Sequence, residues 1–348
     1  MSPRMLRSLF GTVAVLSISL AGAGLSAQAP AEAPRAAAAA KKPSAASSKH
    51  AVKRTPWGDP DLQGTWDYRT ITPLERPQNM GDRQFLTDAE AATLKTRAAK
   101  RLDEPPDEST PANTIHAPYW TDPGRRVLDD KRTSLIIDPP DGRLPPLTPE
   151  GQYRLATGGR GGTGGREGGK ADGPEDRSTL ERCITQGLPT SNLPTLYNNN
   201  VGIYQSPGYV ALVHEMVHET RIVPLDGRPA LSPGIRQWEG SSRGHWDGDT
   251  LVVETTNFTD KTRFRGSTEN LKVTERFSRL DGRTLRYQFT VEDPNTWTRP
   301  WTAEYAWPLT GDQLYEYACH EGNYAMGNIL RGARLKEKEE AEKKSRQQ

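Results

Sequence analysis

The chain has 348 residues, 46 of them lysine or arginine and 44 aspartate or glutamate, for a formal net charge of +2. This balance excludes the overall basic character of a nucleic-acid-binding protein, so we expect no nucleic-acid partner. Hydrophobic residues make up only 34% of the chain, whereas glycine and proline number 32 and 28. Such a composition predicts many turns and a core built from part of the chain.

The first 29 residues have the pattern of an export signal. Two arginines precede a largely apolar run over 9–25, and Ala27-Gln28-Ala29 is a small-x-small cleavage site. The apolar run contains Gly, Ser and Thr and is shorter than a membrane span requires. We expect a periplasmic or secreted product with no stable membrane insertion after cleavage. Residues 30–54, rich in Ala, Pro, Lys and Ser, are predicted to be a disordered spacer.

Residues 55–190 are predicted to form an extended arm that carries one clear helix. Thr87–Leu102 has a capping threonine, acidic residues in its first turn and basic residues in its last turns. A second short helix is expected over Thr148–Ala156, with proline near its start. The glycine-rich stretch 158–173 lacks the Gly-Lys-Ser/Thr of a phosphate loop and is predicted to be a flexible surface loop. Ser134–Ile137 is expected to add an edge strand.

From 191 to 333 the pattern changes to short β-rich runs, several of them separated by Asp-Gly turns, a strong hairpin signal. We therefore predict a mainly β fold, an antiparallel meander that forms either a barrel or a sandwich. Residues 334–348 are predicted to be a charged tail, either a solvated helix or a frayed end. The expected strands are Asn200–Gln205, Val210–Val223, Ile235–Trp238, Thr250–Phe258, Lys272–Leu280, Thr284–Glu292, Trp301–Pro308 and Gln313–Tyr317.

The chain has two cysteines, Cys183 and Cys319. In an oxidising compartment they would form one disulfide that closes a long loop. The alternative is a pair of buried free thiols.

The segment His214-Glu215-Met216-Val217-His218 matches the H-E-x-x-H pattern. On a helix, this spacing would place His214 and His218 as zinc ligands, with Glu215 as general base. On a strand, the two histidines share a face and Glu215 points to the other. The β-branched residues of 210–223 favour the strand. We therefore expect no cofactor, with zinc as the alternative.

Other polar and aromatic residues lie near expected strand ends, where a rigid scaffold often carries functional groups. His320 and Glu321 follow the last expected strand and join His214 and His218 as candidate catalytic residues for acid–base chemistry. The candidate ligand-binding residues are Trp66, Arg236, Trp238, His245 and Trp297.

Three motifs together resemble a family of exported bacterial proteins of unknown function. They are the run from Pro56 to Trp66 (PWGDPDLQGTW), the run from His245 to Thr255 (HWDGDTLVVET) and the run from Cys319 to Tyr324 (CHEGNY). The resemblance implies export and carries no activity. Separately, Gly64-Thr65-Trp66 is similar to the G-x-W that opens the first strand of lipocalins and related calycin barrels.

These observations lead to three hypotheses of function. The first is an exported barrel-like protein that binds a small organic ligand and, by His/Glu acid–base chemistry, transforms it. The second is a zinc metallohydrolase that uses the H-E-x-x-H motif. The third is an envelope interaction protein without a catalytic site. The sequence leaves open whether the protein is an enzyme.

Overall fold

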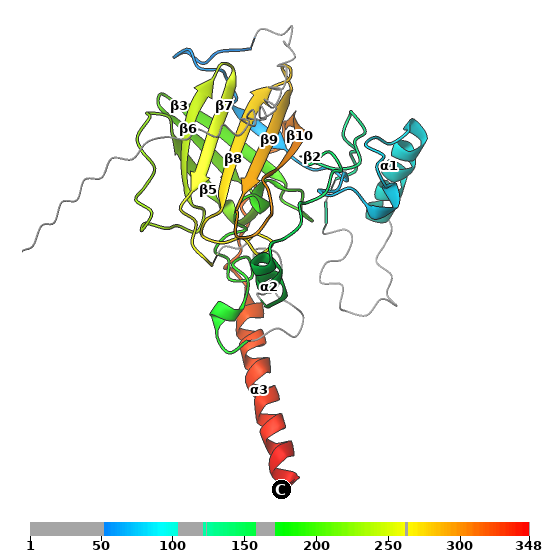
Figure 1. Cartoon of the computed structure of the whole chain (residues 1–348), viewed down its shortest axis with the longest axis vertical. Helices are drawn as coiled ribbons and strands as arrows, with labels where there is room; N and C mark the ends of the chain where they lie inside the picture. Colours follow the sequence, from blue (N-terminus) through cyan, green and yellow to red (C-terminus); the bar gives the residue numbers. More distant parts are fainter. Residues whose placement is uncertain (1–51, 104–120, 123, 158–170, 262–263, 348) are drawn as a thin grey trace, which may run out of the picture. The chain divides into compact units, whose positions relative to one another are not determined.

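In the computed structural model, the described residues are 52–103, 121–122, 124–157, 171–261 and 264–347. Their strands form one ten-stranded antiparallel sheet in the order β5-β4-β3-β1-β10-β9-β8-β7-β6, with β2 also paired to β10 (Figure 1). The strands are β1 (Gly64–Asp67), β2 (Ile136–Asp138), β3 (Asn200–Ser206), β4 (Tyr209–His214), β5 (Thr220–Pro224), β6 (Ser241–Asp247), β7 (Thr250–Thr256), β8 (Lys272–Arg279), β9 (Thr284–Glu292) and β10 (Trp301–Thr310).

The meander follows from alternating sequence patterns joined by tight turns. Along β8, β9 and β10, every second side chain is buried, as expected for strands with one face on a core. The β6–β7 turn places Gly248 at a φ of 60°, in the left-handed region that glycine adopts readily. The prediction of a mainly β, antiparallel fold is confirmed. The expected strand at the G-x-W motif is confirmed as β1, which lies between β3 and β10.

The two edges of the sheet, β5 and β6, come close without sharing a ladder among the described residues. A Cβ atom added to Gly244 in β6 would lie 2.6 Å from Leu225 Cδ2 and 2.8 Å from Val223 Cγ1. Glycine therefore allows β6 to approach the end of β5. The sheet is curved like a barrel but is not closed by backbone hydrogen bonds.

Aromatic side chains fill the interior of this curved sheet. The ring centroids of Tyr287 and Trp307 are 4.2 Å apart, and Tyr68 and Tyr305 pack against Trp307 at 5.7 and 5.8 Å. Trp66, Phe277 and Phe289 belong to the same buried cluster. Burial of this much aromatic surface is the main driving force for the fold.

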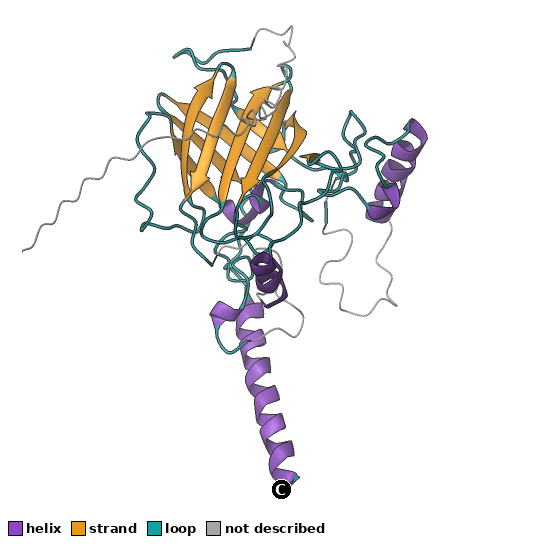
Figure 2. Cartoon of the chain, in the orientation of Figure 1, coloured by secondary structure: helices purple, strands orange, loops and turns teal. Residues whose placement is uncertain are grey.

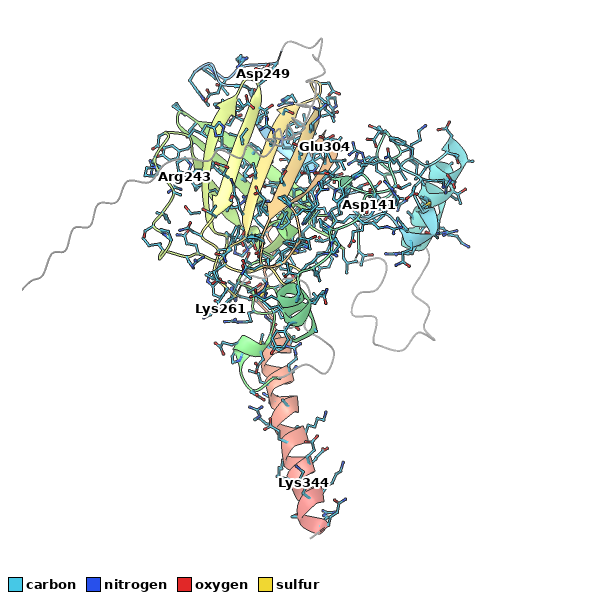
Figure 3. All side chains as sticks on the ribbon, viewed as in Figure 1. Asp141, Arg243, Asp249, Lys261, Glu304 and Lys344 are labelled. Carbon is cyan, nitrogen blue, oxygen red and sulfur yellow. A yellow bond between two sulfur atoms is a disulfide. The ribbon has the colours of Figure 1, made fainter. Side chains whose placement is uncertain are left out.

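The two ends of the sheet differ in their connections. Short turns join the strands at one end, marked by Asp249 in Figure 3, and longer loops gather at the other, marked by Lys261 (Figures 2 and 3). We call the second end the plug end. There β3, β5, β6, β8 and β10 begin, and β1, β4, β7 and β9 finish.

Three expected strands differ from the observed structure. The strand expected over 210–223 is wrong, because β4 ends at His214 and β5 begins only at Thr220. Between them, Val217 and His218 adopt φ values of 57° and 43°, which turn the chain back on itself within the short 3-10 helix η5 (Met216–His218). Residues 235–238 and 313–317 also lie outside the observed strands. The strand that pairs with β7 at this edge of the sheet is instead β6 (Ser241–Asp247), which begins three residues after 238.

Both expected helices are confirmed, as α1 (Asp88–Asp103) and α2 (Pro149–Thr157). A capping box starts α1: the Glu90 backbone N–H donates to Thr87 Oγ1 at 3.2 Å and the Thr87 N–H donates to Glu90 Oε2 at 2.9 Å. The charged tail belongs to a longer helix, α3 (Tyr324–Arg346), which has no buried residue. None of the described helices is both long and apolar enough to cross a membrane.

Several predictions fall outside the described residues. The export signal, most of the spacer and most of the glycine-rich loop lie there.

The expected strand near Ser134–Ile137 is observed as β2, which pairs with β10. Cys183 and Cys319 form the expected disulfide, with a Cα–Cα distance of 5.6 Å.

Replacing both cysteines with serine should lower the free energy of unfolding by about 4 kcal/mol, because the disulfide restricts a long loop of the unfolded chain. The two cysteines are 136 residues apart. Urea-induced unfolding followed by tryptophan fluorescence measures the effect. The wild-type protein under a thiol reductant serves as the control and should unfold at the same urea concentration as the double variant. An unchanged midpoint in both would contradict the prediction.

Candidate functional site

Residues 185–195, here called the plug, contact the plug end of the sheet. The segment contains a single 3-10 turn, η4 (Thr190–Asn192), and no strand. Yet its residues are buried like a core: Thr185, Gln186, Leu188, Ser191 and Asn192 are each no more than 2% exposed. Buried loop backbone and polar side chains must find hydrogen-bond partners. The hydrogen bonds and the cavity around the plug are therefore the features from which a functional site at this end can be identified.

Asn192 inserts its side chain among the strands. Its Nδ2 donates to Glu275 Oε1 at 2.8 Å and to Tyr287 Oη at 2.9 Å. Its Oδ1 bonds to His214 Nε2 at 2.7 Å, and its backbone carbonyl accepts a hydrogen bond from the Tyr305 hydroxyl. One asparagine thus joins β4, β8, β9 and β10.

A buried ion pair spans the interior beside Asn192. Arg221 on β5 donates from Nη1 to Glu275 Oε2 at 2.6 Å and from Nη2 to Glu275 Oε1 at 3.0 Å. Glu275 also accepts from the Tyr287 hydroxyl at 2.9 Å. The exposed fractions of the two charged side chains are 4% and 0%. A pair this buried is held by its bidentate geometry and by the added hydrogen bonds.

His214 is a neutral member of this network. Because a carboxylate only accepts, Asn192 must direct its amide nitrogen at Glu275 and its oxygen at His214. His214 Nε2 therefore carries the proton. Burial, and then the nearby Arg221 charge, lower the pKa of His214 to about 3. An imidazole with this pKa is poorly matched to proton transfer near neutral pH.

Two carboxyl groups meet the start of the plug. The Thr185 hydroxyl donates to Glu239 Oε1, and the Gln186 N–H donates to Glu219 Oε1 at 2.5 Å. Among the described residues, the Oε2 atoms of both glutamates are buried without a hydrogen-bond partner. Burial, and then the charge of Glu239, raise the pKa of Glu219 to about 8. Burial also raises the pKa of Glu239.

The later residues of the plug, Thr190 and 193–195, border a cavity of about 350 Å³. The plug supplies Thr190 and Leu193 to the wall, and Leu135 and Phe264 are buried apolar parts of it. The lining comprises residues 70–74, Leu135, Thr190, 193–195, Phe264 and Arg265.

The cavity has an apolar wall and a charged rim. Phe264 packs against Trp297 and Trp301, with ring centroids 6.2 and 6.0 Å apart. At the rim, Arg265 has a φ of 51°, and its Nη1 donates to Glu75 Oε1 at 2.8 Å. A half-exposed guanidinium with five N–H donors can bind a second acceptor beside Glu75.

The structure places the predicted ligand-binding residues apart from one another. Trp297 lies directly behind Phe264, one side chain away from the cavity. Trp66 is fully buried in the core, where its Nε1 donates to the Leu62 carbonyl and Arg279 stacks over its ring at 4.8 Å. Arg236 and His245 are exposed and Trp238 is half-buried. These residues do not form one site.

The predicted catalytic residues are also separated. His214 is buried, whereas His218, His320 and Glu321 are exposed. His218 Nδ1 lies 3.2 Å from the Tyr317 carbonyl oxygen. The structure brings none of the other three beside His214 in the buried network.

The helix required for the zinc alternative is not observed, because the five residues divide between the end of β4 and a tight turn. The expectation that His214 and His218 share a strand face is wrong for the same reason. Glu215 accepts from Asn200 Nδ2 and from the Tyr315 N–H, both at 3.1 Å. Among the described residues, no three His, Cys, Asp or Glu side chains are arranged to hold a metal ion.

Sequence reasoning missed the residues that build this network, although some left a signal. Glu275 occupies an inward position between Val273 and Phe277, so a charge interrupts the apolar face of β8. Arg221 alternates with Val223 on β5 in the same way. Charges on the apolar face of a strand indicate a buried polar network. Asn192 left no such signal, because nothing in the loop sequence predicts its burial.

Comparisons with known proteins add little to this description. No protein-family model matches the chain, and no curated protein matches it. The fold is similar to a solved structure of a secretary abundant heat soluble (SAHS) protein from Ramazzottius varieornatus. The match covers 35% of this chain and 79% of the SAHS chain, with 12% sequence identity and a TM-score of 0.24. A similarity this weak carries no functional information.

Replacing Arg221 with methionine should lower the free energy of unfolding by about 3–5 kcal/mol, because Glu275 would stay buried without its charge partner. Urea-induced unfolding provides the measurement. The double variant Arg221→Met/Glu275→Gln should recover most of the loss, since it removes both charges and keeps an oxygen acceptor.

The matched control is Arg276→Met, which removes the exposed partner of Asp247 at 2.7 Å. An exposed pair contributes little, so this change should cost less than about 1 kcal/mol. Equal losses in the two single variants would show that the buried pair has no special role.

Proposed function

We propose that this protein binds a small, mainly apolar molecule with one anionic group in the cavity between the plug and residues 70–74. The observation that carries the proposal is the cavity itself, about 350 Å³ and open at a rim that holds Arg265. A volume in this range suits a small organic ligand. Among the described residues, this cavity borders the plug through Thr190 and 193–195, so we assign ligand binding to this place.

The lining supports an apolar ligand body. Phe264 and Leu135 give a buried hydrophobic wall, and Ile71, Leu74 and Leu193 add further apolar surface. The lining hydroxyls are largely engaged already: Thr70 Oγ1 donates to the Arg126 carbonyl at 2.8 Å, and Thr195 Oγ1 donates to the Tyr197 carbonyl at 2.8 Å. The ligand body would therefore gain mostly from burial of apolar surface.

The rim supports an anionic group. Arg265 is the charged residue of the lining, and its half-exposed guanidinium stands beside the apolar wall, 5.9 Å from the centre of the Phe264 ring. A carboxylate or sulfonate could accept from its remaining N–H donors while the ligand body contacts Phe264.

The lining also favours binding over catalysis. It consists of threonine, proline, isoleucine, leucine and phenylalanine with one arginine. These side chains include no general base with a pKa near neutrality. An exported binding protein is consistent with the disulfide, although export itself stays a prediction.

Replacing Pro73 with tryptophan should abolish binding of N-phenyl-1-naphthylamine, a neutral apolar fluorescent probe. Pro73 is an exposed lining residue, and a large side chain there would occupy the cavity. Its carbonyl would still accept from the Leu135 N–H at 2.9 Å, so the fold should be kept. Fluorescence titration gives the affinity, with at least a tenfold loss expected, about 1.4 kcal/mol.

Pro77→Trp is the matched control, since Pro77 is exposed on the same segment and lies outside the lining. It should leave the affinity unchanged. Equal affinity in both variants would place the probe elsewhere and exclude this cavity.

Replacing Arg265 with methionine should weaken binding of 1-anilinonaphthalene-8-sulfonate about fivefold, because a half-exposed charged contact contributes about 1 kcal/mol. N-phenyl-1-naphthylamine, the same ring system without the sulfonate, should bind the variant as well as the wild type. Titrating the two probes side by side separates charge recognition from apolar contact. Equal weakening of both probes would argue against an anionic ligand.

A further inference from the structure

Glu219 and Glu239 are not among the cavity-lining residues and contact the start of the plug, whereas the cavity borders its later residues. Glu219 lies in the turn before β5 and is 8% exposed, and Glu239 precedes β6. Both contact the start of the plug, Glu219 through the Gln186 N–H and Glu239 through the Thr185 hydroxyl. Each has a second carboxyl oxygen that is buried and unpartnered among the described residues.

Thr185 is suited to link the two carboxyl groups. Its hydroxyl donates to Glu239 Oε1 and accepts from the Gly187 N–H at 2.8 Å, and the N–H of the next residue, Gln186, donates to Glu219 Oε1 at 2.5 Å. A hydroxyl has one hydrogen to donate and two lone pairs that accept. It can therefore accept from a protonated Glu219 while it donates to an ionised Glu239.

The surrounding charges do not neutralise a doubly ionised pair. The charge of Arg221 on β5 acts on both glutamates, but its guanidinium is bound in a bidentate pair to Glu275 of β8. Glu275 itself raises the pKa of Glu239.

Among the described residues, His214 and Glu215 are titratable neighbours that add no positive charge. Burial keeps His214 at the end of β4 neutral, because its pKa falls to about 3. Glu215, in the turn after β4, adds a negative charge near Tyr68, whose pKa burial raises well above its usual value. Two carboxyl groups that bind the consecutive residues Thr185 and Gln186, each with a buried oxygen, cannot both ionise without a large cost.

We propose that Glu219 and Glu239 form a proton-binding site, in which one shared proton holds the plug against the plug end of the sheet. Loss of this proton places two negative charges on either side of Thr185. Their repulsion, with Arg221 already bound to Glu275, loosens the contacts of Thr185 and Gln186. The plug then opens from its first residues.

The sign of the pH dependence follows from the raised pKa of Glu219. In the unfolded chain a glutamate releases its proton near its usual pKa of 4.5, whereas the folded protein keeps it up to about 8. Stability from this group is fully present below pH 4.5 and is lost as pH rises through about 8. The plug should therefore be held at neutral pH and loosened at alkaline pH.

A link to ligand release rests on the proposed function. Thr190 and Leu193 of the plug line the cavity, so a loosened plug would widen it. Probe affinity should fall above about pH 8 in the wild type but not in Glu239→Gln, in which an amide replaces one of the two charges.

The decisive experiment is an NMR titration of ligand-free protein labelled with carboxyl-¹³C glutamate. We expect one glutamate carboxyl carbon to titrate near pH 8. That signal should be absent from Glu219→Gln, and in Glu239→Gln its midpoint should fall by at least about one pH unit, because the neighbouring charge is gone. Glu304→Gln, on the outward face of β10, is the control and should leave the titration unchanged.

Hydrogen exchange of the Gln186 and Asn192 amides tests the holding role. After correction for the intrinsic rate, their protection should fall about tenfold between neutral pH and pH 9 in the wild type, and less than about twofold in Glu239→Gln. A protein in which every glutamate carbon titrates below about pH 6 overturns the proton site. A titration near pH 8 with pH-independent protection overturns its role in holding the plug. Neither measurement uses a ligand, so both stand if the cavity proves not to bind one.

Discussion

The hydrogen bonds of Asn192 are the interaction on which the structure of the plug end depends. A loop can be buried against an apolar sheet only if its polar groups are satisfied, and Asn192 meets this demand with contacts to four strands. The Arg221–Glu275 pair supplies the charged acceptor that orients its amide. With this anchor in place, the plug contacts two different environments, a carboxyl pair at its first residues and the cavity at its later ones.

Much of the fold could be predicted from the sequence because local patterns agreed with the tertiary structure. Alternation in β8 to β10 and the Asp-Gly turns indicated the meander, and the caps of α1 and α2 indicated both helices. The strand expected over 210–223 failed where a tertiary constraint prevailed. Its β-branched residues favour extended structure, but a left-handed turn at Val217 and His218 reverses the chain. That turn separated the histidines on which the expected site was built.

The sequence predicted a small-molecule site near strand ends but named none of the residues that line the cavity. A small-molecule site at one end of a β scaffold was expected from strand ends and aromatic residues, and Trp297 does lie behind the cavity wall. The lining itself comes from loops such as 70–74 and 193–195, whose residues show no periodicity. Their positions depend on burial of the plug, a long-range effect that no local pattern encodes.

The position of β1 has a consequence for the order of folding. β3 to β5 and β6 to β10 are each series of neighbours in sequence, so both can pair early. Among the described strands, β1 connects the two series by backbone pairing: Trp66 pairs with Val201 on one side and Leu309 on the other. Because β1 pairs with Leu309, which lies 243 residues after Trp66, the sheet cannot be completed until the chain has been synthesised beyond Leu309. We expect docking of β1 to be the slow, late event that turns two independent ribbons into one sheet.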